Sequence, residues 1–204
     1  SRVYGWRQSP AISSAVWGAL RSGLSSRGHM PEATFSISSW IAIIVQVIAC
    51  VFFKWQKFVN VSHTEKAVDV TGDAGSLFWK IDFINQYIPS FILGNVVRKK
   101  MMFRYPRTNS TITGTSSSKR ATVGDRGNVL LDELGRQTNA AAIVGQTADV
   151  GPRLMISTHY GVGTTFYELC QRPDMHKLVW HWSDHPTFGA GAYRSLGEGK
   201  YEVI

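Results

Sequence analysis

The stretch Ile37–Phe53 most constrains what this chain can fold into, because it contains no charged residue. About 17 apolar residues lie at the lower limit for a membrane-spanning helix, and Lys54 and Lys57 follow as they would at a bilayer surface. A helix buried on all sides within an α/β core has the same composition. The stretch by itself leaves both alternatives open.

Composition narrows the class of protein. The 204 residues contain 22 Lys and Arg against 14 Asp and Glu, a net charge of +8, and 44% of them are hydrophobic. Such a chain can build a core, which excludes wholesale disorder, and its basic excess favours nucleic acid, a nucleotide or a membrane surface as partner. Cys50 and Cys170 are too few for a disulfide scaffold or a four-cysteine zinc site and suit a reducing cytoplasm.

The first residues predict little regular structure. Residues 1–35 are rich in Ser, Gly and Arg without a sustained apolar period, so we expect a loop with a short helix over Ile12–Leu20 and no signal peptide. Because the chain opens with Ser1 rather than Met, we expect a fragment of a longer protein.

From Lys57 onward, short apolar runs alternate with helical patterns. A helix cap is predicted at Ser62–Glu65, and residues 114–128 form a polar loop. Strands are expected at Lys57–Ser62, Met101–Tyr105, Ser110–Thr113, Asn128–Leu131, Arg153–Ser157 and Leu178–Trp182, and helices within Ser76–Ile92 up to Pro89, at Asn139–Val144 and at Thr165–Cys170. This alternation predicts a mainly parallel α/β sheet.

Two strand ends carry chemistry. Val129–Leu131 is followed by Asp132 and Glu133, and an acid pair at the carboxyl edge of a sheet is typical of nucleotide hydrolysis. The first acid holds Mg²⁺ and the second polarises water, whereas an ordinary acidic helix N-terminus is the structural alternative. The next strand ends in Ser157 and Thr158, small hydroxyls that either sense a phosphate or merely begin a loop.

Several blocks occur in a definite order around these strand ends. They are Val68–Ile81, Ser110–Gly114, Gly124–Gly127, Val129–Glu133, Ile156–Gly161, Phe166–Leu169 and the W-x-x-H-P pattern within His181–Pro186. Together they resemble the ATPase domain of tailed-phage terminase large subunits, over roughly residues 33–190.

The resemblance implies a P-loop NTPase fold of the ASCE/RecA-like type, with a mainly parallel sheet flanked by helices. It assigns residues 33–190 to the ATPase domain and 1–32 to an irregular segment or degenerate phosphate loop. Residues 191–204 would be a tail or the start of a linker to an absent nuclease domain, so nuclease activity is not expected. Because family members place a hydrophobic helix behind the phosphate loop, the resemblance favours burial of Ile37–Phe53.

ATP and Mg²⁺ are the implied cofactors. The resemblance assigns Thr34 and Asp132 to Mg²⁺, Glu133 to activation of water and Arg27 to the nucleotide. Ser157 and Thr158 would couple hydrolysis to movement. Arg126, in a Gly-rich loop, is either an arginine finger for a neighbouring subunit or a solvated or DNA-facing arginine.

The expected phosphate loop departs from the family pattern. Pro31 and Glu32 stand where a glycine is expected, and no lysine lies nearby. Proline removes an amide donor and Glu32 repels phosphate. The loop is therefore either remodelled or a degenerate copy that binds ATP poorly, and the sequence leaves both open.

The basic clusters of the sequence are candidates for DNA binding, and the resemblance also implies protein partners. Lys99, Lys100, Arg104, Arg107, Lys119 and Arg120 would contact DNA phosphates or form a solvated face. The implied function is ATP-driven translocation of double-stranded DNA into a procapsid, with a portal protein and small terminase subunit as partners. We expect a homo-oligomeric ring in the host cytoplasm, transiently on the procapsid, and no membrane.

Rival interpretations are a non-hydrolysing fragment that binds DNA or a partner, and a membrane-anchored protein. A metal site built from Cys170, His176, His181, Asp184 and His185 is disfavoured because its spacing fits no zinc pattern.

Overall fold

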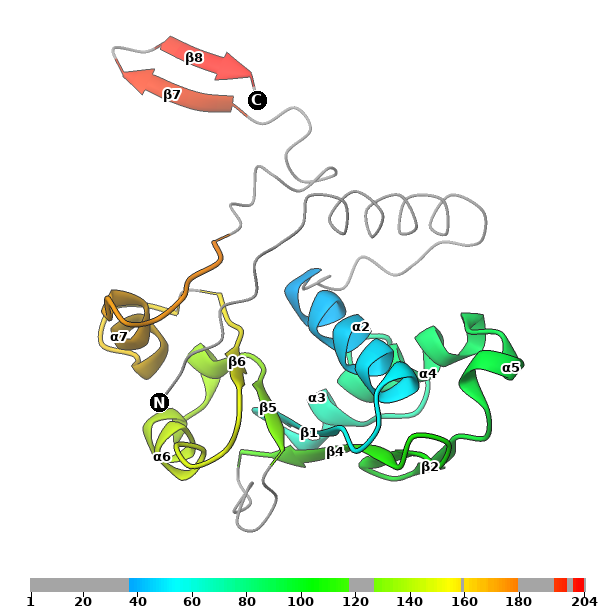
Figure 1. Ribbon diagram of the computed structural model, residues 1–204. Coiled ribbons are helices and arrows are strands. Elements are labelled where there is room, and N and C mark those ends of the chain that lie inside the picture. The colour runs from blue at the N-terminus through cyan, green and yellow to red at the C-terminus, as the bar shows by residue number, and fades with distance from the viewer. Residues whose placement is uncertain (1–36, 118–126, 159, 180–192, 198–199, 204) are drawn as a thin grey trace. The chain divides into compact units, whose positions relative to one another are not determined.

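A six-stranded sheet organises the larger of the chain's two units, residues 8–171 (Figure 1). The computed structural model describes residues 37–117, 127–158, 160–179, 193–197 and 200–203. The strands are β1 (Lys57–Ser62), β2 (Val97–Lys99), β3 (Met102–Tyr105), β4 (Ser110–Ser116), β5 (Asn128–Leu131) and β6 (Arg153–Met155). In the order β2-β3-β4-β1-β5-β6, the last four are parallel to one another, and β2 and β3 add an antiparallel edge. The predicted α/β class with a mainly parallel sheet is confirmed.

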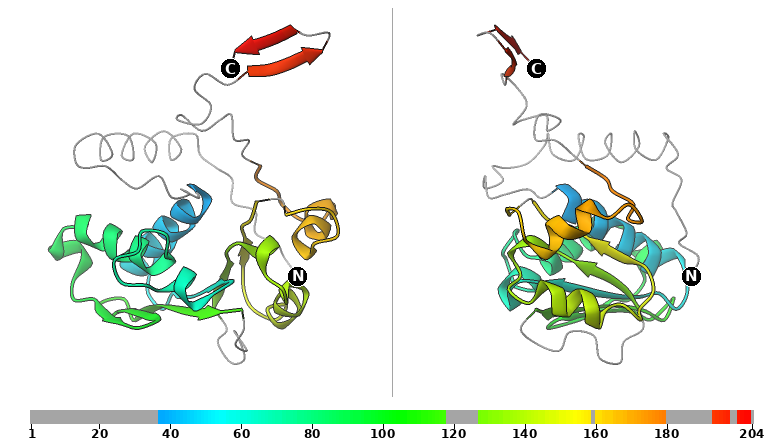
Figure 2. Two further views of the ribbon diagram at one scale, coloured as in Figure 1. Left: turned by 180° about the vertical axis from the view of Figure 1, so that it is seen from behind. Right: turned by 90° about the vertical axis from the view of Figure 1, so that its left-hand side faces the viewer.

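Helices cover both faces of this sheet (Figure 2). They are α2 (Ile37–Phe52), α3 (Glu65–Val68), α4 (Leu77–Tyr87), α5 (Ser90–Leu93), the 3₁₀ helix η1 (Leu134–Arg136), α6 (Ala140–Gln146) and α7 (Thr165–Gln171). α2 and α4 pack on one face, whereas α6 and α7 pack on the other. The smaller unit, residues 1–7 and 172–204, contains a hairpin of β7 (Tyr193–Gly197) and β8 (Lys200–Val203).

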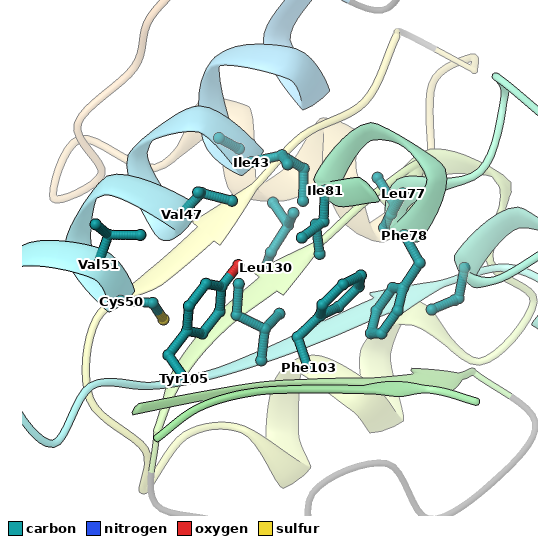
Figure 3. Close-up of a cluster of buried hydrophobic side chains, with 13 residues drawn as sticks. Ile43, Val47, Cys50, Val51, Leu77, Phe78, Ile81, Phe103, Tyr105 and Leu130 are labelled. Atoms are coloured by element: carbon teal, nitrogen blue, oxygen red, sulfur yellow. The ribbon is translucent and has the colours of Figure 1, made fainter. Parts of the chain in front are cut away.

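The apolar stretch forms α2, and its inner side fills the larger of two buried clusters (Figure 3). Ile43, Val47, Cys50 and Val51 of α2 meet side chains from α4, β3 and β5 there. The opposite side exposes large apolar side chains, Val45, Ile48 and Phe52. The helix is therefore buried on the side that faces the sheet, and the alternative of a helix buried on all sides is wrong. None of the helices in the described residues is long and apolar enough to cross a membrane.

Alternation along β1 assigns its side chains to the two faces. Val59 and Val61 pack toward α6, while Asn60 faces α2 and accepts a hydrogen bond of 2.8 Å from Gln46 Nε2. Because successive side chains of a strand point to opposite faces, Ser62 lies on the α2 face as well. A central strand thereby places polar groups beneath the helix that follows the expected phosphate loop.

Several elements differ from expectation. Residues 114–116 belong to β4 rather than to a loop, because β4 pairs with β1 as far as Ser116. A Cβ at Gly114 would lie 2.5 Å from Val68 Cγ1 and 2.7 Å from Phe78 Cε2, so glycine lets the α3–α4 layer approach the strand. β6 ends at Met155, and Leu178 and Val179 are not in a strand. The expected helix Ile12–Leu20 and residues 180–182 lie outside the described residues.

Arg98 joins the β2–β3 hairpin to the helices. Its guanidinium lies 5.1 Å and 4.6 Å from the ring centroids of Phe78 and Phe103 and donates to Asp69 at 2.5 and 3.0 Å and to Asp82 at 3.3 Å. Burial by itself would raise the pKa of Asp69, but the hydrogen bonds from Arg98 and the Met101 amide outweigh it and hold that pKa below its ordinary value. The ionised form of Asp69 therefore stabilises the fold.

We predict that Asp69→Asn lowers the free energy of unfolding at pH 7 by about 1–3 kcal/mol, because the Arg98 charge loses its best acceptor. The folded pKa is depressed, so this stability is present above the unfolded value of about 3.8 and is lost as pH falls through the lower folded pKa. Urea unfolding at pH 7, 5 and 3 should show the gap between variant and wild type closing in acid. Asp174→Asn, which removes an exposed pair with Arg172, is the control and should change nothing measurable. A gap that stays constant with pH contradicts the assignment.

Candidate active site

Asp132 lies directly after β5, where the parallel strands end, and its carboxylate is buried at 6% exposure. Ser39 Oγ, on the first described turn of α2, donates to Oδ1 at 2.6 Å. Ser62 Oγ, at the end of β1, donates to Oδ2 at 3.5 Å. The Asp132 amide also donates to Val61 O at 2.8 Å, which fixes the backbone beside β1. Three elements therefore position one carboxylate.

Burial raises the pKa of Asp132 above its ordinary value, since the charged form has lost water. The Ser39 hydrogen bond opposes this, the neighbouring charge of Glu133 adds to it, and the positive charge of Lys80 opposes it. Lys80, on α4, is itself buried at 5% exposure. The charged groups of the site therefore lie in a low-dielectric environment, in which each strongly affects the others.

Glu133 occupies a strained turn. Its backbone is left-handed, with φ 52° and ψ 41°, and it caps the 3₁₀ helix η1. Residues other than glycine rarely adopt this conformation, and such strain is typical of functional sites. Its Oε2 lies 3.4 Å from Arg136 Nε, yet accepts no hydrogen bond within the described residues. One carboxylate oxygen of Glu133 is therefore buried next to the Arg136 guanidinium without a hydrogen-bond donor in the described residues.

The turn that carries Glu133 is tied to its surroundings on two sides. Gln137 Nε2 donates to Asp132 O at 2.8 Å, and its buried Oε1 has no hydrogen-bond partner in the described residues. On the other side, Gly135 N donates to Ser157 Oγ at 2.9 Å. A Cβ at Gly135 would lie 2.8 Å from that oxygen, so the glycine permits the close approach.

Of the predicted coupling residues, Ser157 contacts the acid-pair turn directly, and its hydroxyl donates onward to Thr158 O at 2.8 Å. The Thr158 side chain is exposed. The structure thus brings Ser157 beside Glu133 through Gly135. The expected roles of Arg27, Thr34, Lys119, Arg120 and Arg126 fall on residues outside those described.

The basic residues Lys99, Lys100 and Arg104 gather on the β2–β3 hairpin and are exposed. Lys100 Nζ lies 2.7 Å from Glu65 Oε1. Since Gly114 N donates to Met101 O at 2.9 Å, the turn between β2 and β3 lies beside the carboxyl half of β4. The hairpin turn and Asp132 therefore lie toward the same edge of the sheet. Arg107 instead donates to Val51 O at 2.6 Å near the end of α2, so its guanidinium stabilises a helix C-terminus.

The donor set at Asp132 fits a hard cation such as Mg²⁺. One carboxylate with neighbouring hydroxyls leaves most coordination positions to water and phosphate oxygens, the usual arrangement of Mg²⁺ with nucleotides. Buried side-chain oxygens of Glu133 and Gln137, which flank η1, have no hydrogen-bond partner in the described residues. No group of three or more His, Cys, Asp or Glu side chains that could hold a metal occurs in the described ranges.

Sequence reasoning missed Ser39, Ser62 and Lys80. Ser39 is one of two serines in an apolar helix, and only its spacing, two turns before Gln46 on the inner side, marks it. The last residue of β1, Ser62, shares a face with Asn60 by alternation, which was a usable signal. No pattern in the sequence predicts that Lys80 acts on Asp132.

A mainly parallel sheet with an acid pair at its carboxyl edge, and a helix that lies beside the first acid, form an α/β fold of the P-loop type. The ATPase domain of the large terminase of Thermus phage P74-26 is similar, with a TM-score of 0.51 and 19% identity, over 66% of this chain and 59% of that one. A mutant of that domain gives a TM-score of 0.49 and 19% identity, over 66% of this chain and 60% of that one.

No family model matches the sequence, and no curated protein matches it. At 19% identity the first likeness establishes a shared fold, and the predicted P-loop fold class is confirmed. The sequence resembles terminase ATPase domains, and the structure shares its fold with one of them. The chain spans about three fifths of the length of the solved domain.

We predict that Ser39 and Asp132 are energetically coupled. Ser39→Ala should cost about 1.5–3 kcal/mol, the usual contribution of a hydrogen bond to a charged group. In a double-mutant cycle with Asp132→Ala, measured by urea unfolding, the coupling energy should reach about 1 kcal/mol or more. Ser39→Ala paired with the exposed Thr138→Ala serves as the uncoupled control. Additive effects for Ser39 and Asp132 would show that the contact contributes nothing.

Proposed function

We propose that the chain is an ATPase domain of a DNA-packaging terminase and hydrolyses ATP with Mg²⁺. The observation that carries the proposal is the Ser39–Asp132 hydrogen bond of 2.6 Å, next to a Glu133 carboxylate oxygen without a hydrogen-bond partner in the described residues. The neighbouring fold is that of a phage terminase ATPase domain, which supports the assignment. Both cofactors are part of the proposal.

In this function Asp132 and the Ser39 hydroxyl would hold Mg²⁺ at the strand end, Thr34 being the sequence-derived second hydroxyl. When bound there, Mg²⁺ would supply positive charge that neutralises the phosphate oxygens. The carboxylate of Glu133 orients the attacking water and accepts its proton. Arg27 contacts the nucleotide, and Arg126 reaches a neighbouring subunit as an arginine finger.

Ser157 and Thr158 link this chemistry to mechanical work. Ser157 accepts from the Gly135 amide, two residues after Glu133, so a shift of the segment that follows β6 would move the turn that carries the catalytic base. Translocation of double-stranded DNA is the proposed output. A portal protein, a small terminase subunit and further copies of this chain in a ring are the proposed partners, on a procapsid in the host cytoplasm.

The hydrolysis step is tested with Mg-ATP turnover. We expect Glu133→Gln to reduce the rate by about 10²–10⁴-fold, because general-base catalysis by a positioned carboxylate contributes that much. Glu168→Gln, which changes an exposed carboxylate on α7, is the matched control and should retain wild-type turnover. Wild type and Glu133→Gln with the same background rate would instead favour the non-hydrolysing, partner-binding alternative.

The DNA interface is proposed to include the exposed side chains of the β2–β3 hairpin, with Lys119 and Arg120 from the sequence. Changing Lys99, Lys100 and Arg104 together to Gln should weaken duplex binding by about tenfold or more and flatten the salt dependence by about one unit of slope for each cation that no longer neutralises a phosphate. Fluorescence anisotropy with one duplex at several salt concentrations measures both quantities. Lys177→Gln, an exposed lysine of the smaller unit, is the control. An unchanged slope in the triple variant places DNA elsewhere.

A further inference from the structure

Lys80 occupies a position that is costly for folding. It lies near the N-terminal end of α4, four residues after the N-cap Ser76, where the helix dipole disfavours a positive charge. Only 5% of the residue is exposed. Its Nζ donates to Gly75 O at 2.9 Å and to Ser76 O at 3.4 Å, two neutral carbonyls of the turn that begins the helix. Burying an ammonium against neutral acceptors costs free energy that these contacts do not offset.

Asp132 is the natural counterpart of this charge. Among the described residues, Lys80 and Asp132 are the only charged residues that are buried as whole residues. Their charges are opposite, and each acts on the other's ionisation, with a smaller contribution to Lys80 from the exposed Asp73. The geometry agrees, since Lys80 Nζ lies 5.9 Å from the ring centroid of Trp40, which follows Ser39, the donor to Asp132. A cation from α4 therefore stands on the same side of the sheet as the first acid and the start of α2.

The segment before α2 contains Arg27 but lacks the lysine that a phosphate loop ordinarily supplies. No lysine precedes Lys54, so the segment before α2 contains none. Lysine binds terminal phosphates in phosphate-loop sites because a compact ammonium offers three donors to several oxygens at once. Lys80 supplies a compact, desolvated ammonium on the same face of the sheet as the acid, where its attraction to a phosphate is strengthened by the low dielectric.

We propose that Lys80 is the ammonium of the nucleotide site and binds the terminal phosphate oxygens of ATP beside Asp132. This inference rests on the proposed ATPase function and adds the residue that replaces the missing phosphate-loop lysine. Before nucleotide binds, the positive charge of Lys80 compensates the negative charge of Asp132. After binding, the Lys80 ammonium contacts the phosphate oxygens. A purely structural lysine would stabilise the fold and leave nucleotide preference unchanged.

The test measures equilibrium binding of a fluorescent ATP analogue and of the matching AMP analogue, with thermal unfolding of each variant. Lys80→Met should weaken ATP binding at least tenfold and AMP binding much less, so that the preference for ATP collapses. Lys66→Met, which changes an exposed lysine of α3, is the matched control and should keep the wild-type preference. An unchanged ATP-to-AMP preference in a folded Lys80→Met protein overturns the inference.

Folding is controlled by a second comparison. Lys80→Met by itself leaves Asp132 buried and uncompensated, whereas Lys80→Met with Asp132→Asn removes both buried charges and should fold at least as well as wild type. The double variant is compared with Asp132→Asn, and the further loss of ATP preference then reports Lys80. If it shows no further loss, Lys80 is structural.

The outcomes separate this inference from the function on which it rests. Wild-type protein that binds neither analogue overturns the ATPase proposal itself. Wild-type protein that binds and hydrolyses ATP, with Glu133→Gln inactive and Lys80→Met unaltered in its preference, leaves the ATPase proposal standing and removes only Lys80.

Discussion

The burial of Asp132 is the constraint on which the arrangement of this site depends. A carboxylate at 6% exposure has lost most of its hydration, and the protein replaces that water with the hydroxyls of Ser39 and Ser62. Those donors come from α2 and β1, so the acid can be buried only if the helix lies over the strand ends. The same helix carries the apolar side chains of the larger core cluster, which holds it there. Core packing and the chemistry of the site therefore support one another.

The bounds of the two central strands β1 and β5 were the part of the fold most accessible from the sequence. β1 and β5 are short, rich in β-branched or aliphatic residues and bounded by polar residues, and both were predicted at their observed bounds. β2 and the β7–β8 hairpin were not predicted, because strands of three to five residues with several charged or polar positions carry no alternating apolar pattern. The last residues of β4 were read as loop for a related reason: Gly114, Thr115 and Ser116 form no apolar run, and their strand conformation depends on pairing with β1.

In the candidate site, too, the residues marked by a local sequence pattern could be predicted, and those placed by tertiary packing could not. Asp132 and Glu133 were selected because they follow an apolar strand, and that pattern is contained in a few consecutive residues. Ser39 and Lys80 belong to the site only because the fold brings them to the side of the sheet that holds Asp132, which is far from both in the sequence. A serine within an apolar helix and a lysine in an amphipathic one have many ordinary explanations, and only the packing of α2 and α4 on one sheet face distinguishes them.

The turn at Glu133 connects the site to the rest of the sheet. A left-handed glutamate persists only where its surroundings over-determine it, and here Leu134 N donates to Ile156 O at 3.1 Å while Gly135 N donates to Ser157 Oγ. Both bonds anchor the turn to the segment after β6. Arg136 extends the link, since its guanidinium lies 3.4 Å from Glu133 Oε2 and 5.8 Å from the Tyr160 ring centroid. A displacement of the segment after β6 would break these contacts together and release the strained glutamate from its position. The strain at Glu133 therefore persists because the hydrogen bonds to the segment after β6 oppose its relaxation.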